Sequence, residues 1–209
     1  MTRWSDADRA VDGAAYDARF AALAAKGADV HGEARLCTVL MPTPALVLDA
    51  GCGTGRVAIR LAELGYVCVG VDVDDSMLER ARLRAPDLLW LQADLADLAD
   101  LAPGPIAAAG VTDPFDLVVA AGNVIPLVAA GTEAVVVAGL AALLAPGGLL
   151  VAGFGLHPDY LPIPEAPVSL AGYDAMCSAA GLVLEQRFAT WSGDPYDDGG
   201  YAVSVHRRA

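Results

Sequence analysis

Acidic residues end two apolar runs of the chain, and a series of glycines follows the first of them. Asp49 is followed at alternate positions by three glycines: Gly51, Gly53 and Gly55. Glycines there let the backbone turn tightly and let a ligand approach main-chain amides at the start of a helix. Asp72 ends the next apolar run, and its carboxylate can accept hydrogen bonds from both hydroxyls of a ribose. The pattern predicts a ligand that contains a nucleoside.

Asp49 and Arg56 favour one class of nucleoside cofactor over another. A dinucleotide fingerprint that starts at Gly51 needs glycine at position 56, where the chain has Arg56. A carboxylate at Asp49 would also oppose a bound pyrophosphate, whereas it suits a cationic ligand. S-adenosylmethionine carries a sulfonium and an ammonium, so Asp49 fits its amino-acid portion and Asp72 fits its ribose. A nicotinamide-dependent dehydrogenase is the less favoured enzyme.

Asp49, the glycines after it and Asp72 can form one site only if a parallel sheet brings the ends of their strands together. From residue 45 onward, short apolar runs alternate with longer helical stretches, which is typical of a sheet covered on both faces. The expected strands lie at 46–48, 67–71, 88–91, 117–120 and 149–154. The expected helices lie at 55–64, 75–85, 94–101 and 133–144. Ligands of such sheets bind outside the carboxyl ends of the strands.

Both ends of the chain differ from this alternation. Two helical stretches between residues 4 and 41 precede the first strand. After the fifth strand, a helix is expected from Ser169, its N-cap, to just before Gly181. The runs 182–191 and 201–206 have no helix between them, which predicts an antiparallel hairpin at the sheet edge. We therefore expect an N-terminal helical cap over residues 1–44 and an α/β domain over residues 45–209.

Residues 45–154 resemble the class I S-adenosylmethionine-dependent methyltransferases, the seven-stranded Rossmann-like family. Segments similar to the family's motifs occur in the family's order at 48–55, 72–78, 92–95, 115–124 and 144–151. The resemblance extends more weakly to residue 209. It implies a doubly wound, mostly parallel seven-stranded sheet with an antiparallel C-terminal edge hairpin. It also implies S-adenosylmethionine as cofactor and S-adenosylhomocysteine as product.

The resemblance also implies a set of cofactor-binding residues. In chain order they are Tyr16, Asp49, Gly51, Cys52, Gly53, Asp72, Val73, Met77, Asp94, Leu95, Ala121 and Asn123. Asp72 is expected to bind the ribose, while Val73 and Met77 cover the adenine. Asp94 is expected to accept a hydrogen bond from the adenine amino group, and the backbone amide of Leu95 faces the ring.

The remaining implied residues lie near the reactive methyl group. Ala121 and Asn123 belong to the loop after the fourth strand, which passes the methyl group in this family. Tyr16 lies on an N-terminal helix, at a position from which such helices often close over the cofactor. We expect residues 1–44 to form a mobile lid in which Trp4, Tyr16 and Phe20 exclude water from the sulfonium. Packing against the far side of the sheet is the alternative.

Several of these residues have structural alternatives. Met77 also suits the core, because its flexible side chain fills gaps between packed elements. Asn123 also suits a helix cap. Asp94 shares a short acidic helix with Asp97 and Asp100, where any of them can be a solvated charge at the helix N-terminus.

The acceptor side is less defined. Methyl transfer is an in-line displacement in which alignment and exclusion of water can suffice, although a hydroxyl, amine or thiol acceptor must lose a proton. His31 is the candidate catalytic base, and His157 is the second; a solvated histidine is the alternative for each. The proline-rich stretch 157–167 is expected to form a wall of the acceptor pocket, or else a rigid surface crossing.

Composition limits the partners. The formal net charge of −13 opposes binding to a phosphate backbone, so we expect no nucleic-acid partner. Pro146 interrupts the uncharged stretch 134–156, which argues against a membrane span. The four cysteines are scattered and no metal-ligand spacing occurs, so we expect reduced, mostly buried thiols and no metal. With no secretory signal visible, a cytoplasmic location is expected.

The sequence therefore predicts an S-adenosylmethionine-dependent methyltransferase that acts on a small-molecule acceptor by in-line methyl transfer. The alternative is a non-catalytic S-adenosylmethionine-binding regulatory protein on the same fold, because fold alone does not fix function. The sequence indicates neither the identity of the acceptor nor an oligomeric state.

Overall fold

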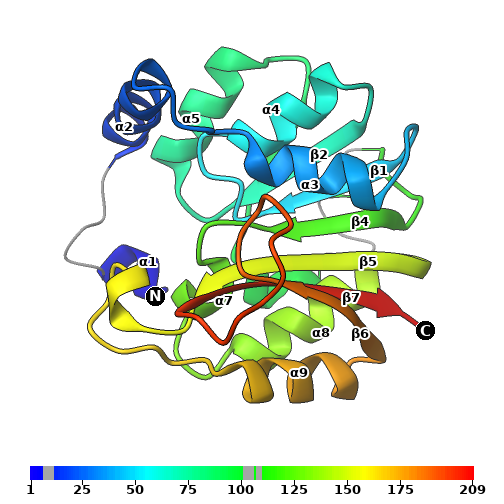
Figure 1. Ribbon diagram of the computed structural model, residues 1–209. Coiled ribbons are helices and arrows are strands. Elements are labelled where there is room, and N and C mark those ends of the chain that lie inside the picture. The colour runs from blue at the N-terminus through cyan, green and yellow to red at the C-terminus, as the bar shows by residue number, and fades with distance from the viewer. Residues whose placement is uncertain (7–11, 101–105, 107–109) are drawn as a thin grey trace.

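A seven-stranded mixed sheet forms the centre of the protein, in the strand order β3-β2-β1-β4-β5-β7-β6 (Figure 1). The computed structural model describes residues 1–6, 12–100, 106 and 110–209, except for the side chains of residues 6 and 98–100. The strands are β1 (Leu46–Ala50), β2 (Val67–Asp72), β3 (Leu89–Gln92), β4 (Phe115–Ala120), β5 (Leu144–Gly155), β6 (Leu182–Phe188) and β7 (Tyr201–Arg208). The first five run parallel, which confirms the predicted doubly wound α/β class.

Helices cover both faces of the sheet because the strands are apolar on both sides. On one face lie α3 (Gly32–Leu40), α4 (Arg56–Glu63) and α5 (Asp75–Arg84), and on the other α8 (Glu133–Leu143) and α9 (Leu170–Ala179) (Figure 1). The shorter helices α7 (Val124–Leu127), η1 (Leu95–Asp100) and η2 (Pro158–Tyr160) follow the ends of β4, β3 and β5. Each face therefore has its own buried apolar cluster, and the strand ends between them are free for a ligand.

The long apolar stretch of the chain divides between a helix and a strand. Helix α8 ends at Leu143 and β5 begins at Leu144, five residues before the expected start at Leu149. A register shift against β4 between Phe115 and Leu117 accommodates the extra residues, which include Pro146. Among the described residues, no helix is long and apolar enough to span a bilayer.

The C-terminal hairpin is confirmed. Strand β7 pairs antiparallel with both β5 and β6, so it inserts between them and leaves β6 at the edge. The Ser169 hydroxyl accepts a hydrogen bond from the Gly172 amide at 3.1 Å and caps α9, and Gly181 follows that helix with a φ of +78°. This left-handed conformation favours glycine and ends the helix.

The described part of the N-terminal segment contains three helices instead of the expected two stretches: α1 (Arg3–Asp6), α2 (Gly13–Ala25) and α3. Ala34, Leu36 and Cys37 of α3 are buried in the same apolar cluster as α4, so α3 belongs to the core. Only α1 and α2 are therefore candidates for the expected lid. Residues 7–11 of that lid, and Leu101 of the helix expected at 94–101, lie outside the described residues.

The cysteine prediction is also confirmed. All four thiols, those of Cys37, Cys52, Cys68 and Cys177, are free and buried. Within the described ranges, no group of three or more histidine, cysteine, aspartate or glutamate side chains gathers as a metal site.

Candidate functional site

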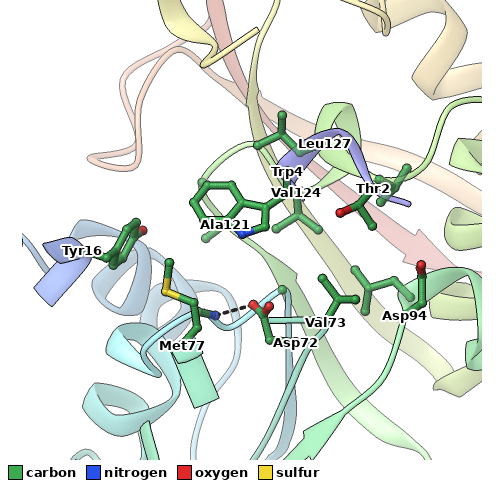
Figure 2. Close-up of a pocket in the computed structure, with 15 residues that line it drawn as sticks. Thr2, Trp4, Tyr16, Asp72, Val73, Met77, Asp94, Ala121, Val124 and Leu127 are labelled. Atoms are coloured by element: carbon green, nitrogen blue, oxygen red, sulfur yellow. Dashed lines mark hydrogen bonds between the residues drawn. The ribbon is translucent and has the colours of Figure 1, made fainter. Parts of the chain in front are cut away.

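A cleft of about 710 Å³, part of it open to solvent, lies at the carboxyl ends of β1, β2 and β4. Figure 2 shows side chains from the N-terminal helices and from the strand ends facing one another across it. The residues that line it are Thr2, Trp4, Tyr16, Gly51, Gly53, Asp72, Val73, Met77, Asp94, Leu95, Ala121, Gly122, Val124, Leu127 and Val128.

The glycine-rich turn after β1 forms the floor of the cleft. Gly51 and Gly53 have φ angles of +70° and +54°, in the left-handed region that glycine tolerates best. A Cβ atom at Gly51 would lie 2.6 Å from the Val124 side chain, so that glycine is required for packing. At Gly53 a Cβ atom would meet nothing within 4 Å. Gly53 therefore faces open space, as a residue must where a ligand approaches the backbone.

Asp72 ends β2 inside the cleft, and its two oxygens are held by the backbone. Oδ2 accepts a hydrogen bond from the Gly53 amide at 2.7 Å, and Oδ1 accepts one from the Asp74 amide at 2.9 Å. Burial raises the pKa of this carboxyl. Each carboxylate oxygen has a further lone pair, so Asp72 can still accept two hydrogen bonds from a diol.

The residues expected around an adenine ring surround one end of the cleft. Val73, Met77, Asp94 and Leu95 all line it. Met77 is also almost fully buried, so it belongs to the core and to the cleft at once. Asp94 Oδ1 accepts a hydrogen bond from the Ala96 amide at 3.0 Å, so Asp94 also stabilises the start of η1.

Asp49 lies behind the glycine-rich turn and does not line the cleft. Its carboxylate is 2% exposed, and Oδ2 accepts a hydrogen bond from the Ala58 amide of α4 at 3.0 Å. Burial raises the pKa of Asp49 to about 7, although the Ala58 amide and the Arg56 guanidinium oppose this shift. The carboxyl is thus poised to ionise when positive charge arrives nearby.

Cys52 and Asn123, two further expected residues, also lie outside the lining. The Cys52 thiol is buried, and a Cβ atom at Gly70 would lie 2.9 Å from its sulfur. Asn123 has a φ of +71° and makes no side-chain cap to α7. Its Oδ1 accepts a hydrogen bond from the Gly155 amide at 2.7 Å, and its Nδ2 donates to the Tyr160 carbonyl at 3.0 Å. Asn123 therefore joins the loop after β4 to the end of β5.

Tyr16 lines the cleft at the outer end of a stacked cluster. Its ring centroid is 4.9 Å from that of Phe20, and the Phe20 ring in turn lies 4.4 Å from the guanidinium carbon of Arg56. Arg56 donates two hydrogen bonds to Glu33, of 2.7 Å and 2.5 Å. This forked ion pair neutralises the Arg56 charge and joins α4 to α3. Burial raises the pKa of Tyr16, so its hydroxyl stays protonated at neutral pH.

None of the three histidines lines the cleft. His31 is exposed at the start of α3, where its amide donates a hydrogen bond to Asp29 Oδ1 at 3.0 Å. His157 is exposed and contacts Asp159 at 3.2 Å. His206 is 1% exposed under α9, and burial lowers its pKa. His157 follows the end of β5, yet the structure brings no histidine into the cleft.

Sequence reasoning missed several lining residues: Thr2, Gly122, Val124, Leu127 and Val128. Val124 and Leu127 belong to the helix that follows the fourth strand, so their position after Asn123 was an available signal. Trp4 was expected at the mouth of the cleft as part of the lid, and it lines the cleft. Thr2 had no signal at all.

The arrangement is suited to binding more than to proton transfer. Among the lining residues, the ionisable side chains are Tyr16, Asp72 and Asp94, and no lysine, arginine, cysteine or histidine joins them. Carboxylates at the ends of β2 and β3 can accept hydrogen bonds from a ribose and from an amino-purine. The apolar side chains between them can cover a planar ring.

Comparison with known proteins gives a consistent result. Residues 47–148 match the family described as "Methyltransferase domain". A TehB-like S-adenosylmethionine-dependent methyltransferase of Corynebacterium glutamicum is 30% identical, over 94% of this chain and 98% of that one, with a TM-score of 0.79.

Two curated relatives are longer than this chain. A putative methyltransferase of Bacillus subtilis, YqeM, is 24% identical over 75% of this chain and 65% of its own length. A trans-aconitate 2-methyltransferase of Acidovorax sp. is 32% identical over 78% of this chain and 58% of its own length. The chain therefore matches less than two thirds of each.

Proposed function

The chain belongs to the S-adenosylmethionine-dependent methyltransferases, and from this premise we propose that it transfers the cofactor's methyl group to a small-molecule acceptor. One observation carries the proposal. Gly53, with open space above it, and the Asp72 carboxylate lie in one cleft and are joined by a 2.7 Å hydrogen bond. A backbone that a ligand can approach, next to an acceptor for a diol, suits the nucleoside of this cofactor.

The residues present fit S-adenosylmethionine along the length of the cleft. We infer that Asp72 holds the ribose, and that Val73, Met77, Asp94 and Leu95 hold the adenine. The methionine portion would lie over Gly51 and Gly53, with Tyr16 above it. Three further residues would act from behind the lining: Asp49 by its charge, and Cys52 and Asn123 by holding the loops. Ala121 would face the methyl group.

The bound cofactor would supply an electrophilic methyl group on its sulfonium. The chain's own contribution is to align an acceptor with that methyl group and to keep water out. Tyr16, Trp4 and Val124 supply apolar surface around the cleft, which supports this role. Because the two lining carboxylates, Asp72 and Asp94, are assigned to the cofactor and no histidine or lysine lines the cleft, a proton lost by the acceptor would pass to solvent. His31 is a candidate base only for an acceptor that extends out of the cleft toward α3.

The net charge of the chain and the name of a similar protein both favour a small acceptor over a macromolecule. The net charge of −13 opposes approach of a nucleic acid. The similar Acidovorax protein is named for trans-aconitate, a small molecule, which supports the same class here. The trans-aconitate name does not fix this chain's acceptor.

Aromatic side chains beyond Asn123 supply a candidate wall for the acceptor. Tyr160 and Tyr201 have ring centroids 6.4 Å apart, and the Trp191 Nε1 donates a hydrogen bond to the Tyr201 hydroxyl at 2.9 Å. A Cβ atom at Gly153 would lie 2.3 Å from the Trp191 ring and 2.8 Å from the Tyr201 hydroxyl, and one at Gly155 would lie 2.7 Å from the Tyr160 Cβ. Tyr160 is the member of the proline-rich stretch that joins this wall.

Calorimetric titration with S-adenosylmethionine and S-adenosylhomocysteine tests the cofactor assignment. Asp72→Ala should weaken both by about 10-fold to 100-fold, because two hydroxyls lose a charged acceptor. Asp75→Ala is the matched control, since Asp75 is an exposed neighbour on α5 that pairs with Arg82. Unchanged affinity in a folded Asp72→Ala protein would contradict the assignment. Release of S-adenosylhomocysteine with candidate acceptors then distinguishes an enzyme from a non-catalytic binding protein.

A further inference from the structure

The N-terminal helix α1 is attached to the β4 side of the cleft through Arg3. The Arg3 guanidinium donates a hydrogen bond to the Pro126 carbonyl at 3.1 Å and pairs with Glu133 at 2.7 Å. The Arg3 amide also reaches the Val128 carbonyl at 3.4 Å. Thr2 beside it is buried. These contacts fix the start of the chain to α7 and α8.

The same helix reaches the β2 side of the cleft through the next residue. The Trp4 indole nitrogen donates a hydrogen bond to Asp74 Oδ2 at 3.1 Å. Figure 2 shows the Trp4 indole extending into the cleft on the side opposite Asp72. Because Arg3 is bonded to the β4 side of the cleft and Trp4 to the β2 side, α1 crosses the cleft.

Helix α1 depends on tertiary contacts for its stability and for its position. The helix is only four residues long, far below the length at which a helix is stable by itself in water. Its position therefore depends on the Arg3 and Trp4 contacts, and loss of either would release one side of the crossing.

Asp74 connects the Trp4 contact to the candidate ribose ligand. Its Oδ1 caps α5 by accepting from the Ser76 amide at 3.0 Å, and its amide donates to Asp72 Oδ1 at 2.9 Å. Trp4, Asp74 and Asp72 thus form one chain of hydrogen bonds. A ligand that fixes Asp72 also fixes the group to which Trp4 is bound.

We propose that Trp4 is a cofactor-positioning residue, and that α1 is a strap that must open for the cofactor's nucleoside to leave. This inference rests on the proposed function, because it takes the nucleoside of S-adenosylmethionine to lie next to Asp72. The indole closes the cleft opposite the ribose, and its N–H makes that closure depend on Asp74.

Stopped-flow kinetics with S-adenosylhomocysteine test the strap. Trp4→Phe keeps an aromatic ring and loses the N–H donor, and Trp4→Ala loses both. We expect the dissociation rate to rise about 5-fold to 10-fold in Trp4→Phe and further in Trp4→Ala, with the melting temperature little changed. Tyr66→Phe is the control, because it keeps an aromatic ring and removes a donor that binds the Met41 carbonyl at the amino end of β2, away from the cleft, and its rate should equal that of the wild type.

A double-mutant cycle separates a strap from simple wall packing. If Trp4 acts through Asp74, then Asp74→Ala and Trp4→Phe together should raise the dissociation rate by less than the product of their separate effects. Multiplicative effects would overturn the link through Asp74. A folded Trp4→Ala protein with the wild-type dissociation rate would overturn the strap, while wild-type binding that still depends on Asp72 would leave the proposed function intact.

Discussion

Burial raises the pKa of the Asp49 carboxyl to about 7, so the fold disfavours its ionisation. Its unfolded pKa is near 4, so between these values the native state binds more protons than the unfolded state. Stability contributed by the protonated form is therefore lost as pH rises through this window. Urea unfolding of the wild type should show a loss of roughly 2 to 3 kcal/mol between pH 5 and pH 8 from this group.

Asp49→Asn should lack that loss, because an amide keeps an oxygen for the Ala58 amide and does not titrate. The difference in free energy of unfolding between the two proteins should accordingly change across the window in favour of the variant. Parallel pH profiles for both proteins would show that Asp49 is already ionised in the native state at pH 5.

Gly53 gives a second test at the residue scale. Gly53→Val should abolish S-adenosylhomocysteine binding, because the branched side chain would fill the open space that we assign to the methionine portion. Strain also arises, since φ is +54°. Gly181→Val is the matched control: it has a φ of +78°, an equally open surrounding and a position far along the chain, after α9. Circular dichroism should show both variants folded, with calorimetric binding retained only in Gly181→Val.

The sequence predicted the residues at the strand ends, which form the floor of the cleft, better than the orientation of the side chains in the loops above them. Gly53, Asp72 and Asp94 end strands or follow them directly, so their place follows from the parallel sheet itself. Asn123 has the expected position, yet its side chain turns to Gly155 and Tyr160. That orientation depends on a left-handed φ and on backbone partners 32 and 37 residues later, and a local sequence pattern contains neither.

At the scale of elements, α1 and α3 have different roles although the sequence placed both in one cap. We propose that α1 and α2 form the cap, whereas α3 is part of the core of the domain that was expected to begin at residue 45. Deleting residues 1–6 should leave the melting temperature within a few degrees of the wild type and raise the dissociation rate of S-adenosylhomocysteine. Deleting residues 1–44 should unfold the protein, because Leu36 and Cys37 leave a cavity that costs several kcal/mol.

Hydrogen exchange can locate the mobile part of this cap. Amides of α1 and α2 should become more protected when S-adenosylhomocysteine binds, whereas those of α3 should be protected in both states. Equal protection of α1 with and without ligand would favour fixed packing over a closing lid.

The elements that the sequence predicted best are those with a strong apolar period. Strands β1, β2 and β4 occur at their expected runs, because both faces of each are buried and only apolar residues satisfy them. The start of β5 was placed too late, since the turn at Pro146 suggested a break, whereas a register shift against β4 keeps the chain in the sheet. Helix α1 was not predicted as a separate helix, because four residues are too few to show a helical period of apolar side chains.

At the scale of the whole molecule, the net charge of −13 creates a negative field that attracts cations. S-adenosylmethionine and S-adenosylhomocysteine differ by one methyl group and one positive charge, so they form a matched pair of probes for that field. Asp72 and Asp94 in the lining, with Asp49 behind it, give the field the same sign inside the cleft. Arg56, whose positive charge acts on the Asp49 carboxyl, is neutralised by Glu33 and does not cancel this negative field.

Salt should therefore weaken the binding of S-adenosylmethionine more than that of S-adenosylhomocysteine. Between 50 mM and 500 mM sodium chloride, we expect the dissociation constant of S-adenosylmethionine to rise about 2-fold to 5-fold relative to that of S-adenosylhomocysteine. The reason is that the Debye screening length shortens to a few ångströms. Calorimetry at four salt concentrations measures both constants on the same protein. A ratio that stays constant would mean that the sulfonium is recognised only by direct contacts, and that the acidic surface acts on solubility and on exclusion of polyanions instead.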